Sequence, residues 1–479
     1  MLLLAQAAEI FPEQVTTNQL LQNVVYASGV VGALIVVAGL VMLDAGGVRR
    51  PNVFNSTIEK VVGFFIGFAT YYAIGFALWN WQYNEAFEVP NALGQSIEDF
   101  WLGGTLTGEL AQNVSPDVFP GLNNFQVFIF FLAAFAGIIN ILLHFAVSER
   151  MRASAFYITC FVASIVSSFV SYLTWGSVGP LTNAGFHDFF GAGFVYLLPA
   201  AMALVFVTRL GRRPGMFGAH PRVAEYRAGN LWTLAVGVLL VFAGLPMVIM
   251  SCLFFFDPEA LAVSVTMADT SVGIALNNYA LAWAGGALTG ALIAYRTRKY
   301  AYLLLGPFAG YVSGASGLDV YTPWQMFLVA LGAPFAAYAV YEFIGRKLVD
   351  EHKLLPVFAG AGTYGLIMVG LVQWGTPHGG YVGIEEGTYA FQNAEINVFW
   401  QLLGIVVIFA IGIVTAAILT FIFERTGMLR VPDDEQAAGL DLGFWELKGD
   451  EGLGAIPEWQ PSAAPEATAA PRAPTAPPR

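Results

Sequence analysis

Long apolar stretches alternate with short polar segments along most of this chain. Eleven stretches of roughly 20 residues, the length of a helix that crosses a bilayer core, are rich in aliphatic, aromatic and small side chains. They cover residues 22–43, 59–80, 124–147, 153–174, 189–208, 230–255, 271–295, 301–317, 323–345, 355–374 and 399–423. The pattern predicts an all-α integral membrane protein with eleven transmembrane helices.

Basic residues fall on one side of this arrangement. The N-terminal segment and the loops 81–123, 175–188, 256–270, 318–322 and 375–398 contain no Lys or Arg. The alternate loops carry them, among others Arg49, Arg150, Arg213, Arg296 and Arg425. Because Lys and Arg accumulate in cytoplasmic loops, we expect the N-terminus outside, the C-terminus inside, and a location in the cell (inner) membrane.

The polar segments at the two ends divide the chain further. Residues 1–21 are expected to be extracytoplasmic, and residues 22–425 form the predicted membrane domain. Residues 426–455 are polar and read as a cytoplasmic regulatory tail. Residues 456–479 are rich in Pro and Ala, a composition that cannot bury enough apolar surface to fold, so we expect them to be disordered.

One stretch in the fifth span has a counterpart in the tenth. Asp188 stands near the start of an apolar run, where a carboxylate can cap orphan backbone N–H groups, and Tyr196 follows eight residues later. Asp350 is followed by Phe358 at the same spacing. The match predicts two inverted five-helix repeats plus a final helix. Repeats of this kind place a substrate path at their interface.

The composition excludes several other classes of protein. The chain is 57% hydrophobic and only 11% charged, and its mean hydropathy is +0.64. The basic residues form no nucleic-acid patch, no Cys/His cluster suggests a metal, and no motif suggests a cofactor or an enzyme. Cys160 and Cys252 lie inside apolar spans and are interpreted as core residues. A haem-bearing respiratory subunit is disfavoured, because no span offers a pair of histidines at haem-ligand spacing.

Four motifs carry a resemblance to a known family. They are GLVMLDAGGVRRPNVFN (39–55), HFAVSERMRASAF (144–156), WGSVGPLTNAGFHDFFGAGFVY (175–196) and LRVPDDEQAAGLDL (429–442). In this order they resemble motifs of the ammonium transporter (Amt/Rh) superfamily over essentially the whole membrane domain. The resemblance implies a homotrimer with one narrow pore in each subunit. It also implies transport of ammonium, generally by removal of a proton and passage of neutral ammonia.

The resemblance assigns roles to several residues. Trp175 and Asp188 match the substrate recruitment site, where a cation stacks on the indole ring. Phe131 and Phe135 match the outer pore gate, and Phe131 also borders the recruitment site. Without the resemblance, these two phenylalanines would be interpreted as ordinary core residues.

The lumen departs from the family pattern. Tyr196 and Phe358 occupy the positions of the family's two lumen histidines, so both imidazoles of the usual proton relay are missing. Leu245 aligns with the second gate aromatic, and Ile249 aligns with the recruitment serine. His144 is the one histidine considered as a substitute, and a structural role is the preferred interpretation for it.

Two functions therefore remain open. The first is ammonium or ammonia transport through a degenerate pore. The alternative is a non-conducting member of the family that acts as a sensor or as a structural subunit of a membrane complex. In that case the working surface would be the tail, whose motif contains Arg430, Asp433, Gly439 and Asp441 and resembles the family's docking site for a cytoplasmic nitrogen-regulatory signal protein. The adjoining Phe444–Trp445 pair could either anchor such a partner or pack under the membrane domain.

Overall fold

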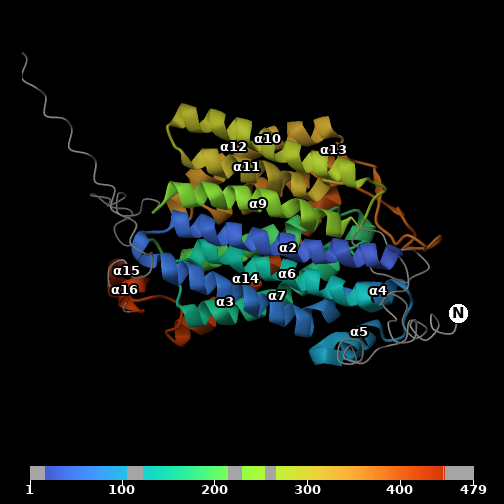
Figure 1. Ribbon diagram of the computed structural model, residues 1–479, viewed down its shortest axis with the longest axis horizontal. Coiled ribbons are helices and arrows are strands. Elements are labelled where there is room, and N and C mark those ends of the chain that lie inside the picture. Colours follow the sequence, from blue (N-terminus) through green and yellow to red (C-terminus); the bar gives the residue numbers. More distant parts are fainter. Residues whose placement is uncertain (1–16, 105–121, 214–228, 254–265, 446, 448–479) are drawn as a thin grey trace, which may run out of the picture.

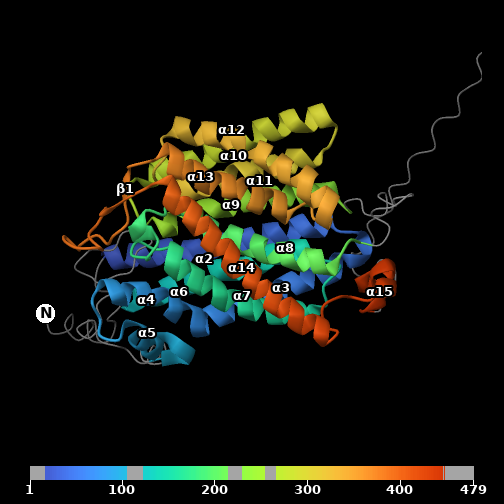
Figure 2. The same ribbon diagram turned by 180° about the vertical axis from the view of Figure 1, so that it is seen from behind.

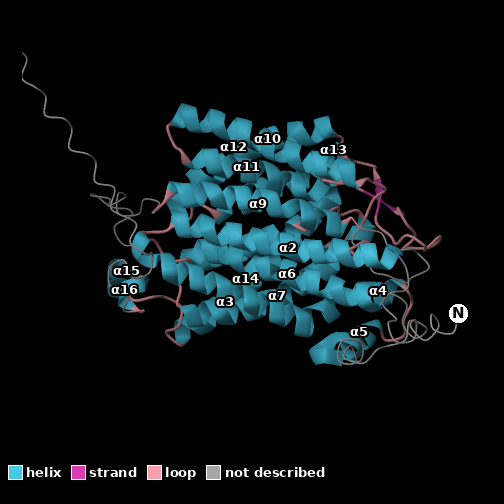
Figure 3. Ribbon diagram, in the orientation of Figure 1, coloured by secondary structure: helices cyan, strands magenta, loops and turns pink. Residues whose placement is uncertain are grey.

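The computed structural model describes residues 17–104, 122–213, 229–253, 266–445 and 447. Helices dominate it, and the described strands are limited to one short antiparallel pair (Figure 3). The helices of the first half are α2 (Thr17–Gly47), α3 (Val53–Thr70), η3 (Tyr71–Gly75), α4 (Phe76–Ala86), α6 (Leu122–Val147), α7 (Ala153–Thr174), η8 (Ala192–Leu197) and α8 (Leu198–Leu210). Those of the second half are α9 (Leu231–Cys252), α10 (Val272–Thr297), α11 (Ala301–Gly314), α12 (Pro323–Val340), η12 (Tyr341–Val349), η13 (Leu355–Ala361), α13 (Gly362–Val372) and α14 (Val398–Arg425).

Shorter elements connect these helices and form the tail. They are η2 (Arg50–Asn52), α5 (Ala92–Phe100), η4 (Trp101–Gly103), η7 (Thr182–Ala184), η11 (Ala315–Gly317), β1 (Pro377–His378), β2 (Ala394–Glu395), α15 (Asp433–Ala438) and α16 (Leu440–Gly443). In the antiparallel pair, Pro377 lies opposite Glu395 and His378 lies opposite Ala394.

A helix coincides with each of the eleven predicted spans. Within the described residues, nine helical segments are long and apolar enough to cross a membrane. The other two spans correspond to α10 and to the 14-residue α11. The prediction of an all-α membrane protein is therefore confirmed, and the count of eleven crossings stays a prediction. The second helix is longer than expected and runs on to Ala86, because polar side chains in its last turns, such as Asn80 and Gln82, are buried rather than solvated.

The helices lie roughly side by side, with α10–α13 along one edge of the bundle and α3, α4 and α7 along the other (Figure 1). Helix α2 packs along α9 because small residues let their backbones approach closely. A Cβ atom on Gly32 would lie 2.6 Å from the carbonyl oxygen of Gly244, and one on Gly39 would lie 2.8 Å from that of Gly237. Seen from behind, α14 runs obliquely across the bundle and packs on α8 and α13 (Figure 2).

The two ends of the bundle differ in chemistry. Helices α15 and α16 lie at one end, together with Arg49, Arg150 and Arg213; we call this the basic end. Strand β1 and helix α5 lie at the opposite end (Figure 2), where the loops carry no Lys or Arg.

The tail is docked on the basic end of the bundle. The carboxylate of Asp441 accepts hydrogen bonds from the backbone N–H groups of Phe54 (3.0 Å) and Asn55 (2.8 Å), and so caps the start of α3. The indole ring of Trp445 meets the Phe54 ring edge-on and donates a hydrogen bond of 2.9 Å from its Nε1 to Asn55 Oδ1. Trp445 therefore packs against the membrane domain with 41% of its surface still exposed, and Phe444 is 61% exposed.

Replacing Gly439 by Ala is expected to loosen this docking. Gly439 has φ = 97°, and a Cβ atom there would lie 2.5 Å from Cβ of Pro51. Adding this contact to the backbone strain should weaken tail docking by about 1–3 kcal/mol and speed hydrogen exchange across residues 433–445. Gly427 is the matched control, since it also has positive φ but a Cβ there would meet nothing within 4 Å. Equal exchange in Gly439→Ala and Gly427→Ala would show that close packing on Pro51 does not hold the tail.

Candidate functional site

Asp188 is buried and caps the helix of the fifth predicted span, which begins with η8. Its carboxylate accepts hydrogen bonds from the backbone N–H groups of Ala192 (2.6 Å) and Gly193 (2.7 Å). The helix begins in a π-helical turn, and Gly191 supplies the left-handed residue (φ = 72°) that turns the chain into it. Burial raises the pKa of Asp188 to about 7, although the two backbone donors act in the opposite direction. Asp188 therefore titrates near neutral pH.

An aromatic cluster lies beside this cap. The rings of Phe131 and Phe135 are parallel, with centroids 6.3 Å apart and an interplanar angle of 2°. Phe135 also contacts Trp175 at 5.9 Å. The Trp175 Nε1 donates a hydrogen bond of 3.0 Å to the carbonyl oxygen of Phe189, next to Asp188. The structure thus brings together the predicted recruitment and gate residues. Trp175 is only 1% exposed, so its ring meets a cation only when its aromatic neighbours move.

Tyr196 and Phe358 face each other. Their rings stack with centroids 5.2 Å apart and an interplanar angle of 26°; we call them the Tyr196–Phe358 pair. Both belong to π-helical turns, η8 and η13, that open the two half-helices, and π-helical turns occur frequently at functional sites. The Tyr196 hydroxyl forms a hydrogen bond of 2.6 Å with the hydroxyl of Tyr311. The sequence analysis missed Tyr311, which the chain alone does not distinguish from other core tyrosines.

Leu245 and Ile249, the two lumen candidates of the sixth span, are located by their burial alone. Leu245 and Ile249 are both buried on α9, one turn apart, in the same apolar core as the Tyr196–Phe358 pair. Their shared face is set by the i, i+4 spacing.

A cavity of about 450 Å³ reaches Phe358 from the basic end. Its wall is mostly apolar, with Leu40, Leu43 and Val357 among its lining residues. Arg213 and Lys353 also line it. Phe358 thus separates this cavity from Tyr196.

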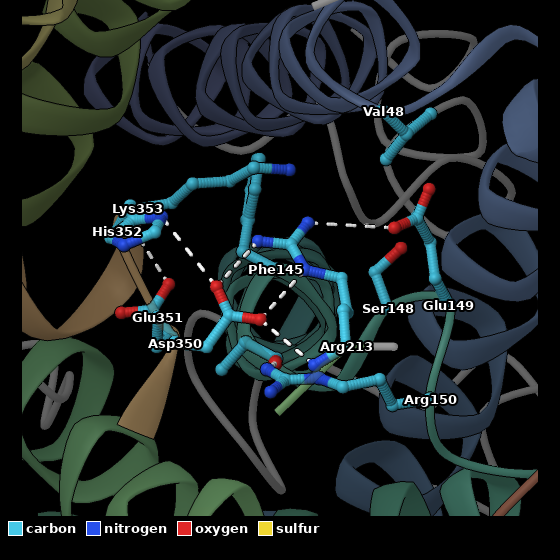
Figure 4. A pocket seen from close by; sticks show the side chains of 11 residues that line it. Val48, Phe145, Ser148, Glu149, Arg150, Arg213, Asp350, Glu351, His352 and Lys353 are labelled. Atoms are coloured by element: carbon cyan, nitrogen blue, oxygen red, sulfur yellow. Dashed lines mark hydrogen bonds and ion pairs between the residues drawn. The ribbon is translucent and has the colours of Figure 1, made fainter. Parts of the chain in front are cut away.

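The predicted acid of the second half plays a different part from Asp188. The Arg213 guanidinium donates two hydrogen bonds to the Asp350 carboxylate, from Nε to Oδ2 at 3.0 Å and from Nη2 to Oδ1 at 2.9 Å (Figure 4). Burial opposes ionisation, but this guanidinium lowers the pKa of Asp350 below its usual value. Asp350 is near the helix start, as predicted, yet its carboxylate serves an ion pair at the basic end.

Glu351 makes the helix cap instead. Its carboxylate accepts hydrogen bonds from the backbone N–H groups of Lys353 (2.8 Å), Leu354 (2.8 Å) and Leu355 (2.7 Å). Glu351 is one residue closer to Phe358 than Asp350 is, and its longer side chain reaches these three N–H groups. The spacing of eight residues pointed to Asp350, and it could not show that the next residue holds the backbone.

A chain of buried charged groups links four segments near the basic end. Asp44 on α2 accepts from Lys60 Nζ on α3 at 2.5 Å and from Lys353 Nζ at 2.5 Å. His144 on α6 contacts Lys60 through Nδ1 and Glu59 Oε2 through Nε2, the latter at 2.6 Å. His144 has a partner at each ring nitrogen, as expected of a structural histidine. In the sequence, Lys60 is simply one more basic residue on the side that carries the positive charges, whereas in the structure its side chain is fully buried.

Comparisons with known proteins agree with this architecture. A profile of the Ammonium Transporter Family matches residues 24–448. A putative ammonium transporter of Synechocystis sp. is 26% identical over 431 residues, covering 88% of this chain and 87% of that protein. The ammonium transporter Amt2 of Archaeoglobus fulgidus is 26% identical over 430 residues, covering 85% and 83%.

Two solved structures share the fold. A structure described as a sensor Amt protein superimposes with a TM-score of 0.71 at 18% identity, covering 89% of this chain and 98% of that one. Candida albicans Mep2 superimposes with a TM-score of 0.63 at 20% identity, covering 86% and 87%. Since the family profile spans nearly the whole chain, from the first membrane helix to the docked tail, the chain belongs to the Ammonium Transporter Family.

Proposed function

We propose that this protein moves ammonium or ammonia across a membrane through a path whose narrowest point is the Tyr196–Phe358 pair. The observation that carries the proposal is the position of this pair. Phe358 closes a cavity that reaches it from the basic end, and Tyr196 lies on the half-helix that Asp188 caps from the other side. Family membership supplies the substrate class.

The proposed topology follows the charge distribution. All eleven helical spans cross the cell (inner) membrane, with the basic end in the cytoplasm and β1 outside. The absence of Lys and Arg from the loops 81–123, 175–188, 256–270, 318–322 and 375–398 supports this orientation. The chain functions as a homotrimer with one path per subunit.

The species that crosses the pair is neutral ammonia. A monocation in the middle of a bilayer costs several kcal/mol, and the pair offers no group that carries a proton at neutral pH. Phe358 has no titratable atom, and an ordinary tyrosine hydroxyl has a pKa near 10. Trp175, Asp188 and Phe131 recruit the cation before it loses its proton, Phe135 gates the entry, and Leu245 and Ile249 line the path.

Transport by purified protein in proteoliposomes tests the proposal. We expect a stopped-flow pH signal of ammonia flux that exceeds that of protein-free vesicles, with little ammonium-evoked current. Current that saturates with ammonium would mean that a charged route passes Tyr196. If folded protein gives neither signal, it does not transport, and the alternative below applies.

A second candidate function is a non-conducting sensor or structural subunit. The packed Tyr196–Phe358 pair and the docked tail favour it. The tail motif with Arg430, Asp433, Gly439 and Asp441 would then bind a cytoplasmic signal protein, with the exposed Phe444 as part of the contact. Arg430 and Asp433 form an ion pair of 2.8 Å with each other, so a partner would meet a preformed surface.

A further inference from the structure

A buried group of titratable side chains lies at the end of the bundle opposite the tail. His187 precedes Asp188, Asp319 follows η11, and His378 belongs to β1. These three residues come from three loops that contain no Lys or Arg. His187 and His378 are fully buried and Asp319 is 4% exposed.

The three side chains form a hydrogen-bonded chain. His187 Nε2 lies 3.0 Å from Asp319 Oδ1, and His187 Nδ1 lies 3.3 Å from His378 Nδ1. A carboxylate only accepts, so His187 donates from Nε2, and in the neutral ring, which carries one proton, its Nδ1 is then bare. His378 must then donate from Nδ1, and its Nε2 is left without a proton. The order of donors fixes both tautomers.

The bare Nε2 of His378 has no hydrogen-bond partner within the part of the chain that the structure describes, and it is buried. Burial, with a smaller contribution from the charge of His187, lowers the pKa of His378 well below its usual value. The imidazole is therefore neutral at rest, with a bare lone pair at Nε2. Among the described residues, no group of three or more His, Cys, Asp and Glu side chains is arranged to hold a metal ion, which removes a metal site as the explanation for this group.

The chain adjoins the recruitment residues. The backbone N–H of Phe189 donates to the carbonyl oxygen of Ser316 at 3.2 Å, which ties the Asp188 loop to the turn that carries Asp319. Trp175 binds the carbonyl oxygen of Phe189 from the other side. The carboxyl groups near His187 are those of Asp188, its neighbour in the chain, and Asp319, its hydrogen-bond partner. Glu395, on the strand paired with β1, is exposed.

We propose that His378, His187 and Asp319 form a proton relay that takes the proton from ammonium at the outer end of the path. The inference rests on the proposed function and adds the group that performs its deprotonation. His378 is the acceptor; His187 and Asp319 are positioning residues that stabilise the charge it takes up.

The proton balance of the step is complete. One N–H bond of ammonium breaks, and an N–H bond forms at His378 Nε2, so that ammonia leaves. The Nδ1 proton of His378 passes to Nδ1 of His187, whose imidazolium form is paired with Asp319. The reverse shift returns the proton from His187 Nδ1 to His378 Nδ1, and the proton on His378 Nε2 then leaves to outside water. Because the proton stays on the outer side, ammonia crosses without net charge.

Two variants in proteoliposomes test the relay through their pH profiles. In wild type, ammonia flux at fixed ammonia concentration should fall on the acid side, where the relay is already protonated. His378→Gln should lower the flux on the order of a hundredfold and abolish this acid limb, since an amide does not take up a proton. Asp319→Asn should move the acid limb to lower pH, because it removes the carboxylate that pairs with the protonated relay.

Asn183→Ala is the structural control. Asn183 Oδ1 accepts a hydrogen bond of 2.9 Å from the backbone N–H of Gly380, which holds the His378 loop without any titratable group. This variant should scale the flux down, if at all, by the same factor at every pH. The relay is overturned if His378→Gln keeps wild-type flux and acid limb, or if Asp319→Asn behaves like Asn183→Ala. A wild-type current that saturates with ammonium would contradict the step in which the proton returns to the outside. Absence of any flux from folded wild type would instead overturn the proposed function.

Discussion

Lys60→Met should destabilise the folded protein by about 3–5 kcal/mol, the cost of breaking a buried ion pair from one side. The Lys60 and Asp44 side chains are 0% and 1% exposed. Removing the ammonium leaves Asp44 with one cation, Lys353, and leaves His144 without its partner at Nδ1. The midpoint of thermal unfolding in detergent, followed by tryptophan fluorescence, measures the loss.

The double variant Asp44→Asn with Lys60→Met is the control for this prediction. Removing both charges avoids a buried carboxylate that keeps only the partly exposed Lys353 as its cation, so the double variant should be more stable than Lys60→Met alone. Lys353 loses its partner in the double variant, but it is 34% exposed and can be solvated. A double variant that is less stable than the single one would contradict the assignment of the cost to the unpaired charge.

Placing histidine at both lumen positions should raise ammonium-dependent current. Tyr196→His with Phe358→His sets two imidazoles where the ring centroids are 5.2 Å apart, close enough for a direct hydrogen bond. This supplies the proton-carrying groups that the Tyr196–Phe358 pair lacks. The gain should be on the order of a hundredfold, the lower end of what a positioned proton-transferring group contributes.

Tyr196→Phe is the matched control for the histidine pair. It keeps the ring stack and removes only the hydroxyl that bonds Tyr311. It should give no added current, because it adds no proton-carrying group. If the double histidine variant folds and gains no current, the path is blocked at some point besides the Tyr196–Phe358 pair.

Much of the fold was predictable from the sequence, because apolar length alone identifies a membrane helix. The spacing from an acidic residue placed Tyr196 and Phe358 at matching positions of the two halves, and the family resemblance placed both in one lumen; the stacking of their rings is seen only in the structure. The role of the acid in the second half was not. Spacing selected Asp350, and only the three-dimensional path of the backbone shows that Glu351 makes the cap.

Contacts between distant positions limited the prediction of the site. His187 and His378 are 191 positions apart, and in the sequence each stands alone in its own loop. Lys60 and His144 lie in different predicted spans, 84 positions apart. Trp445 and Phe54, which pack together, are still further apart in the sequence. The sequence therefore left open whether the Phe444–Trp445 pair anchors a partner or packs under the membrane domain. No local sequence pattern predicts these long-range contacts, because they form only when the chain folds.

The ion pair between Asp44 and Lys60 has a consequence for how the protein enters its membrane. A charged residue at the centre of an inserting helix costs roughly 2.5–3.5 kcal/mol and one near a helix end costs less; Asp44 and Lys60 lie near the facing ends of consecutive helices, 16 positions apart. Inserting α2 and α3 together as a hairpin lets each charge neutralise the other on entry. We therefore expect the translocon to release the first two spans as one unit, before α6 has been synthesised.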